Sequence, residues 1–189
     1  EQAEVFYPAN NQVWYNTYGG DFVTYKSHPF DANITSHEAG VCIGEMCYSL
    51  YCITCDASVT AVNSLEFYNS DLQIIYLPHS VTTIGGSAFF KSQNLEEVHI
   101  GSGIKSIGDG AFTNCGNMQK LYIRATTPPS LGNYALVSDS SGMYTYIGCT
   151  IYVPESAVAA YKAHPNWSKY ADYIRAYDFV AGKEPESGD

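Results

Sequence analysis

The most reactive side chains in this sequence belong to six cysteines, four of them within residues 42–55. Thiols this close together suit a zinc site, a disulfide involving Cys42, Cys47 or Cys52, or unpaired buried residues that act as small hydrophobic groups. Cys52 and Cys55 lie three apart in a predicted strand, so their side chains point to opposite faces, which disfavours joint metal ligation. The six cysteines are Cys42, Cys47, Cys52, Cys55, Cys115 and Cys149.

A second group that could do chemistry pairs His99 with Glu97, two residues earlier in a predicted strand. Acid–base catalysis would need a nucleophile or a second carboxylate beside them, and the sequence suggests neither. The glycine turns after Ile84 and Ile107 lack the Lys-Ser/Thr of a phosphate loop, and no Gly-x-Ser-x-Gly elbow occurs. The histidines also lack metal-ligand spacing. We therefore predict a protein that is not an enzyme and has no metal site or cofactor.

The negative net charge argues against two classes of binding partner. The chain of 189 residues carries a net charge of −10 with only nine Lys plus Arg, which argues against nucleic acid and against an anionic membrane surface. No run approaches 18 apolar residues, so we predict no membrane span. The 17 tyrosines are unusual, and tyrosine suits half-buried surfaces because its body is apolar and its hydroxyl is polar.

These residues must be positioned by a duplicated stretch, residues 72–117. It reads LQIIYLPHSVTTIGGSAFFKSQN and then LEEVHIGSGIKSIGDGAFTNCGN, at an offset of 23 residues. A fixed period of this length is typical of stacked repeat proteins. Each row opens with a short strand in which Ile75 and Leu77 face one side, and Val81, Ile84 and Phe89 follow as further inward positions. Such a coil leaves its upper and lower faces open, so only stacking can bury them.

The flanking sequence predicts degenerate coils on either side of the duplication and a cap at each end of the stack. Residues 50–71 repeat the apolar pattern without the signature glycine, and residues 118–148 repeat it with a Ser/Gly/Asp-rich loop at 137–148. A hairpin at residues 13–25 would cover one end, and short helices at 155–163 and 166–174 the other. The predicted divisions are a linker at 1–12, an N-terminal β cap at 13–49, about five coils at 50–71, 72–94, 95–117, 118–148 and 149–153, a C-terminal cap at 154–181 and a disordered tail at 182–189.

The row Leu-x-x-Ile-x-Leu-Pro-x-x-Val-x-x-Ile-Gly-x-x-Ala-Phe, with Phe-Thr-Asn-Cys-Gly-Asn-Met at 112–118, resembles the leucine-rich repeats of BspA-like bacterial proteins. The resemblance implies an α/β, β-rich leucine-rich-repeat solenoid: a short right-handed stack of coils with a parallel concave sheet. It also implies a secreted or surface-attached bacterial protein used for adhesion, and a buried free thiol at Cys115. No signal peptide begins at Glu1, so we expect that any leader has been trimmed.

Stacking would align outward strand residues in ladders on the concave sheet. One interpretation is cross-strand packing that stabilises the sheet, and the other is a binding stripe for a protein or sugar. The ladders, in chain order, are Thr54, Tyr76, His99, Tyr122 and Tyr152; Cys52, Ile74, Glu97, Lys120 and Thr150; and Asp56, Pro78, Gly101, Arg124 and Pro154.

The sequence therefore favours a non-enzymatic interaction module that binds an extracellular protein or matrix component through this face. Two alternatives stay open: a carbohydrate-binding accessory protein, because tyrosines can stack on sugar rings, and a structural spacer in a larger surface protein. The oligomeric state is not predicted. The residues expected to bind are Tyr76, Glu97, His99, Lys120, Tyr122 and Tyr152.

Overall fold

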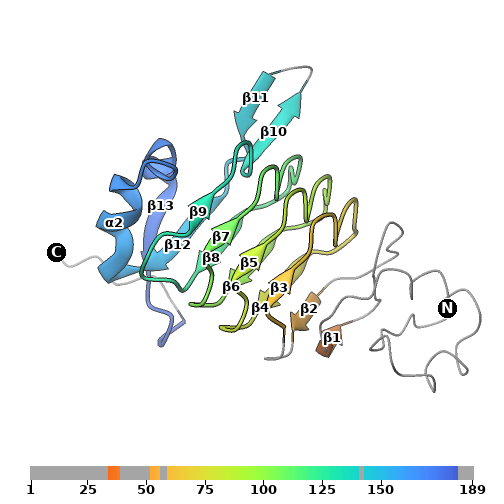
Figure 1. Ribbon diagram of the computed structural model, residues 1–189, viewed down its shortest axis with the longest axis horizontal. Coiled ribbons are helices and arrows are strands. Elements are labelled where there is room, and N and C mark those ends of the chain that lie inside the picture. The colour runs from red at the N-terminus through yellow and green to blue at the C-terminus, as the bar shows by residue number, and fades with distance from the viewer. Residues whose placement is uncertain (1–33, 39–51, 56–58, 141–142, 183–189) are drawn as a thin grey trace, which may run out of the picture.

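The computed structural model describes residues 34–38, 52–55, 59–140 and 143–182, and within them the chain forms a β-rich stack of coils (Figure 1). The larger sheet has seven strands in the order β1-β2-β4-β6-β8-β12-β13. All neighbours in it are parallel except β1, which runs antiparallel to β2. Its strands are β1 (Ile34–Glu38), β2 (Cys52–Cys55), β4 (Ile74–Leu77), β6 (Glu97–Ile100), β8 (Lys120–Ile123), β12 (Thr150–Pro154) and β13 (Ile174–Tyr177).

A second parallel sheet runs along the stack, with one very short strand from each coil. Its order is β3-β5-β7-β9, and the inward residues Val62, Ile84, Ile107 and Leu131 lie in register across it. This register confirms that the rows predicted from the 22- and 23-residue offsets are equivalent coils. The strands are β3 (Ala61–Val62), β5 (Thr83–Ile84), β7 (Ser106–Ile107) and β9 (Ser130–Leu131).

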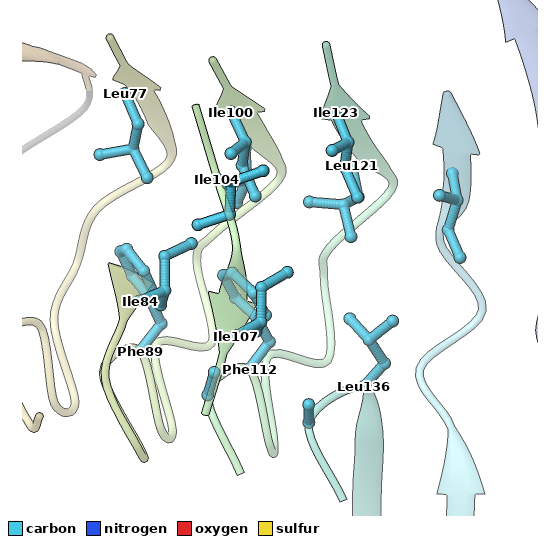
Figure 2. Packing of buried hydrophobic residues seen from close by; sticks show 14 of the residues in the cluster. Leu77, Ile84, Phe89, Ile100, Ile104, Ile107, Phe112, Leu121, Ile123 and Leu136 are labelled. Carbon is cyan, nitrogen blue, oxygen red and sulfur yellow. The ribbon is translucent and has the colours of Figure 1, made fainter. Parts of the chain in front are cut away.

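The hydrophobic core lies between the two sheets, as Figure 2 shows. Phe67, Phe89 and Phe112 form a continuous ring stack inside it, with centroids 5.1 Å apart at each step. All three rings are at most 1% exposed. Leu136 takes the equivalent place in the next coil and is also buried. Each aromatic side chain therefore packs against the same position one coil away, which is how the open faces of single coils become buried.

Glycine marks the closest approach of neighbouring coils. A Cβ atom on Gly85 would lie 2.4 Å from the amide nitrogen of Ser64, and one on Gly108 would lie 2.6 Å from that of Gly86. Neither glycine has a positive φ. Their role is therefore close contact rather than the turn-making that the sequence suggested. Asn63, which replaces glycine in the coil at 50–71, is the first member of this row in the described chain.

The C-terminal end of the stack is covered by short helical segments. These are the 3-10 turn η2 (Glu155–Ala157), the helix α2 (Val158–Ala163) and the 3-10 turn η3 (Ser168–Tyr173). The buried Tyr161 donates its hydroxyl to the carbonyl oxygen of Ala125 at 3.0 Å, and the buried Trp167 donates its indole N–H to that of Pro129 at 2.7 Å. The coil at 118–148 thus supplies acceptors for the polar ends of both capping rings.

One local prediction was wrong, and one strand was not predicted. The loop expected at 137–148 contains an antiparallel hairpin, β10 (Val137–Ser140) with β11 (Met143–Tyr146), which projects beside the coils (Figure 1). Residues beyond η3 were not expected to extend the sheet, but β13 adds a strand beside β12. The linker at 1–12, the hairpin at 13–25, Cys42, Cys47 and residues 183–189 lie outside the described residues.

Candidate functional site

Four rings stand in one row on the outer face of the larger sheet. The register pairs Tyr76 with His99, His99 with Tyr122, and Tyr122 with Tyr152, so one ring comes from each of β4, β6, β8 and β12. Neighbouring centroids are 4.3, 4.3 and 4.8 Å apart, with interplanar angles of at most 22°. We call these four residues the aromatic row. Its predicted alignment is confirmed, and Thr54 of β2 lies in register at its start.

A charged pair, Glu97 and Lys120, lies beside the row, two residues before His99 and Tyr122 in their strands. Lys120 Nζ is 2.7 Å from Glu97 Oε1, and His99 Nε2 is 3.2 Å from Glu97 Oε2. Burial alone would raise the pKa of Glu97, but the hydrogen bonds with Lys120 and His99 outweigh it and hold the pKa below its usual value. Burial between two tyrosine rings lowers the pKa of His99, although its hydrogen bond to Glu97 acts in the opposite sense. His99 is therefore a neutral packing and hydrogen-bonding group near pH 7.

The two ends of the aromatic row differ sharply in exposure. Tyr76 is 39% exposed, whereas Tyr122 and Tyr152 are only 8% and 9% exposed. The covering residues are Tyr177 and Phe179, which belong to a segment that begins at the last residue of β13 and that we call the C-terminal turn (residues 177–182). The ring of Tyr177 lies 4.9 Å from that of Tyr122 and 5.3 Å from that of Tyr152. The face thus has an open half and a covered half.

This cover was not predicted from the sequence. Arg124 was placed in an outward ladder but not among the expected binding residues, and Tyr177 and Phe179 were not singled out. A signal was present, because Ile174 and Ala176 alternate with Arg175 and Tyr177, which is the period of a half-buried strand. That strand carries Tyr177 onto the same face as the aromatic row.

The other candidates for chemistry that lie within the described residues do not converge on a site. Cys55, Cys115 and Cys149 are unpaired and buried, and burial raises the pKa of Cys55 and of Cys149 to about 12. Thiols this far from ionisation are poor nucleophiles and poor metal ligands. Among the described residues no cluster of His, Cys, Asp and Glu is suited to hold a metal ion.

Cys115 instead makes a structural hydrogen bond. Its thiol lies 2.9 Å from the carbonyl oxygen of Phe89. The equivalent residue one coil earlier is Ser92, whose hydroxyl lies 2.6 Å from the carbonyl oxygen of Phe67. The Cys115 thiol therefore donates the same hydrogen bond that the Ser92 hydroxyl donates one coil earlier.

The parallel strands, the 22- to 24-residue period and the ring stack between two narrow sheets define a leucine-rich-repeat solenoid. A family model for the BspA type leucine-rich repeat region matches residues 33–141 in six copies. The chain therefore belongs to the BspA-type leucine-rich repeat family, as its motifs suggested. A search of curated protein sequences found no match. Within the described residues, no helix has the length and apolar character needed to cross a bilayer.

Proposed function

We propose that the protein is a non-enzymatic module, secreted or attached to a cell surface, that binds an extracellular protein through the outer face of its larger sheet. The observation that supports this most is the aromatic row itself. Four rings from four separate strands are aligned on a rigid scaffold, with the open end at Tyr76. Rigid aromatic residues flanked by polar groups are the commonest anchors of protein interfaces.

The charged groups beside the row support recognition rather than catalysis. Glu97 is held by Lys120 and His99, so its carboxylate is already paired. Lys120 keeps 39% of its side chain exposed and can offer further donors to a partner. The proposed binding residues are Tyr76, Glu97, His99, Lys120, Tyr122 and Tyr152.

The ring geometry favours a protein partner over a carbohydrate. Within the row, the ring faces point at one another at 4.3 to 4.8 Å, so mainly ring edges and polar tips face outward. Stacking on a sugar needs an accessible ring face. Carbohydrate binding remains the alternative, and it would have to use the outer face of Tyr76 at the end of the row.

The test is a binding screen of the full chain against purified extracellular-matrix proteins and, in parallel, a glycan array. We expect at least one protein ligand whose affinity falls ten-fold or more in Tyr76→Ala and further in Tyr76→Ala with Tyr122→Ala. Tyr144→Ala, which removes a tyrosine 55% exposed on the projecting hairpin, is the matched control and should bind normally. A protein ligand insensitive to both Tyr76 variants, or binding to glycans alone, would contradict the proposal.

A further inference from the structure

The covered half of the aromatic row shows what kind of group this surface accepts. Tyr177 and Phe179 approach Tyr122 edge-on, with interplanar angles of 70° and 77°. The two covering rings also meet each other at 5.0 Å and 62°. Edge-to-face contacts are the arrangement that aromatic quadrupoles prefer. The contact is therefore a specific fit between rings and not a loose hydrophobic cover.

Arg124 adds a second element of recognition. Its guanidinium carbon lies 4.8 Å from the centroid of the Phe179 ring, and its Nη1 donates to the carbonyl oxygen of Phe179 at 3.4 Å. One side chain thus contacts both the ring and the backbone of the same residue. The equivalent outward positions in the two preceding coils are Gly101 and Pro78, so this arginine is specific to the covered half.

The C-terminal turn holds its own shape. Asp178 Oδ1 accepts hydrogen bonds from the amides of Val180 and Ala181 at 2.8 and 2.9 Å, and its carbonyl oxygen accepts one from the amide of Gly182. Gly182 has a φ of +68°, which glycine adopts without strain. The turn therefore presents Phe179 through hydrogen bonds made within the turn itself.

The cover lies on the face of the sheet opposite the coil core. Tyr122 and Tyr152 point outward from the sheet, while Leu121 and Ile151 of the same strands belong to the buried hydrophobic core. Val180 is completely exposed, so the turn rests on the sheet through Tyr177 and Phe179. The ring contacts of Tyr177 and Phe179 with Tyr122 and Tyr152, and the contacts of Arg124 with Phe179, hold it there.

From these contacts we propose that Tyr122, Arg124 and Tyr152 form a recognition site for a peptide turn that carries an aromatic side chain. The chain's own C-terminal turn occupies the site in the isolated protein and is displaced by a partner peptide of the same chemistry. This deepens the proposed function, on which it rests, by naming the partner's recognition element: an aromatic residue with an accessible backbone carbonyl.

The experiment uses the full chain and a synthetic peptide of residues 176–182, Ala-Tyr-Asp-Phe-Val-Ala-Gly, with both ends blocked. In the variant Tyr177→Ala with Phe179→Ala the site is vacated, and we expect calorimetry or fluorescence polarisation to detect binding of the peptide. Wild type should bind at least ten-fold more weakly, because the tethered turn competes at an effective concentration in the millimolar range. Adding Arg124→Ala to the vacated variant should lower its affinity at least ten-fold.

A second peptide, with leucine in place of both aromatic residues, is the matched control and should not bind the vacated variant. The proposal is overturned if the vacated variant ignores the aromatic peptide up to millimolar concentration, binds both peptides equally, or is unaffected by Arg124→Ala.

Hydrogen exchange on wild type gives a readout that does not depend on how the variants fold. We expect the bonded amides of Val180, Ala181 and Gly182 to exchange at least 100-fold faster than those of β6 and β8, since the turn opens without the core. Exchange only on global unfolding would make the turn a fixed part of the fold and overturn the proposal. Neither measurement needs the extracellular partner. If the screen described above finds no protein ligand whose binding depends on Tyr76, the proposed function is refuted and the peptide and exchange results still stand. If the peptide experiment fails, the proposed function still stands.

Discussion

Replacing Phe89 by alanine tests the inward ring stack most directly. Phe89 is fully buried and stacks on both Phe67 and Phe112 at 5.1 Å. A buried Phe→Ala change costs about 3–5 kcal/mol, through lost transfer free energy and the cavity that remains. Each of the two ring pairs adds about 0.5–1.5 kcal/mol beyond burial, so we expect the upper end of that range. Because whole domains are stable by about 5–15 kcal/mol, the loss is a third or more of the total.

The assay is equilibrium urea unfolding followed by far-UV circular dichroism, with Phe90→Ala as the matched control. Phe90 is the next residue, is only half-buried and stacks on Tyr68 at 5.7 Å, so its removal should cost less than about 2 kcal/mol. The reasoning is refuted if Phe89→Ala lowers the free energy of unfolding by no more than Phe90→Ala does. A large loss in both variants would also contradict it, because burial would then not decide the cost.

Three further predictions concern other features of the stack. Gly108→Ala should destabilise the fold by about 1–3 kcal/mol and lower its melting temperature, because the new Cβ would lie 2.6 Å from the backbone of the neighbouring coil. Gly116→Ala is the control and should change the melting temperature little, because no atom lies within 4 Å of its Cβ. Equal shifts in the two variants would contradict the close-approach role of Gly108. Cys115→Ser should be more stable than Cys115→Ala in urea unfolding, because it keeps a donor to the Phe89 carbonyl worth about 0.5–1.5 kcal/mol; the reverse order would show that the thiol acts only as an apolar group. Stability should fall as pH is lowered through 6.5 and again through 4.5, since the pKa values of His99 and Glu97 lie below these ordinary values in the folded state and the unfolded chain binds the protons first. Unfolding curves of wild type and His99→Gln should show the loss near pH 6.5 in wild type only, and an NMR titration that places the pKa of His99 above 6.5 would overturn the prediction.

The parts of the fold that could be predicted are those repeated in the sequence. Two rows at an offset of 23 residues place Ile84 on Ile107 and Phe89 on Phe112, and the structure has these residues in the same inward positions. Once the inward set is known, the outward set follows from the alternation of a strand, which is why Tyr76, His99 and Tyr122 were aligned correctly. Because each coil stacks on an equivalent coil, aligning the repeats in the sequence predicts which residues are neighbours in the structure.

The parts that could not be predicted depend on contacts made once. The hairpin of β10 and β11 replaces the expected loop because Val137 pairs with Tyr146 across a polar stretch that has loop composition. The alternation within Ile174–Tyr177 is compatible with a strand, but it does not specify that this strand pairs with the edge of β12. The cover of Tyr122 by Phe179 likewise joins residues far apart in the chain. The alignment of the aromatic row was therefore predicted correctly, but its division into open and covered halves was not foreseen.

The indole of Trp167, which donates to the carbonyl oxygen of Pro129, gives the molecule an optical reporter at one end of its stack. The sequence contains only one other tryptophan, Trp14, so Trp14→Phe leaves a single indole at the C-terminal cap. Stacked coils exchange stability only with their neighbours, and such chains can come apart from an end. The emission of Trp167 would then record the detachment of the cap, while circular dichroism records the whole array. Comparing the two signals would show whether the stack melts as a unit or unzips from this end.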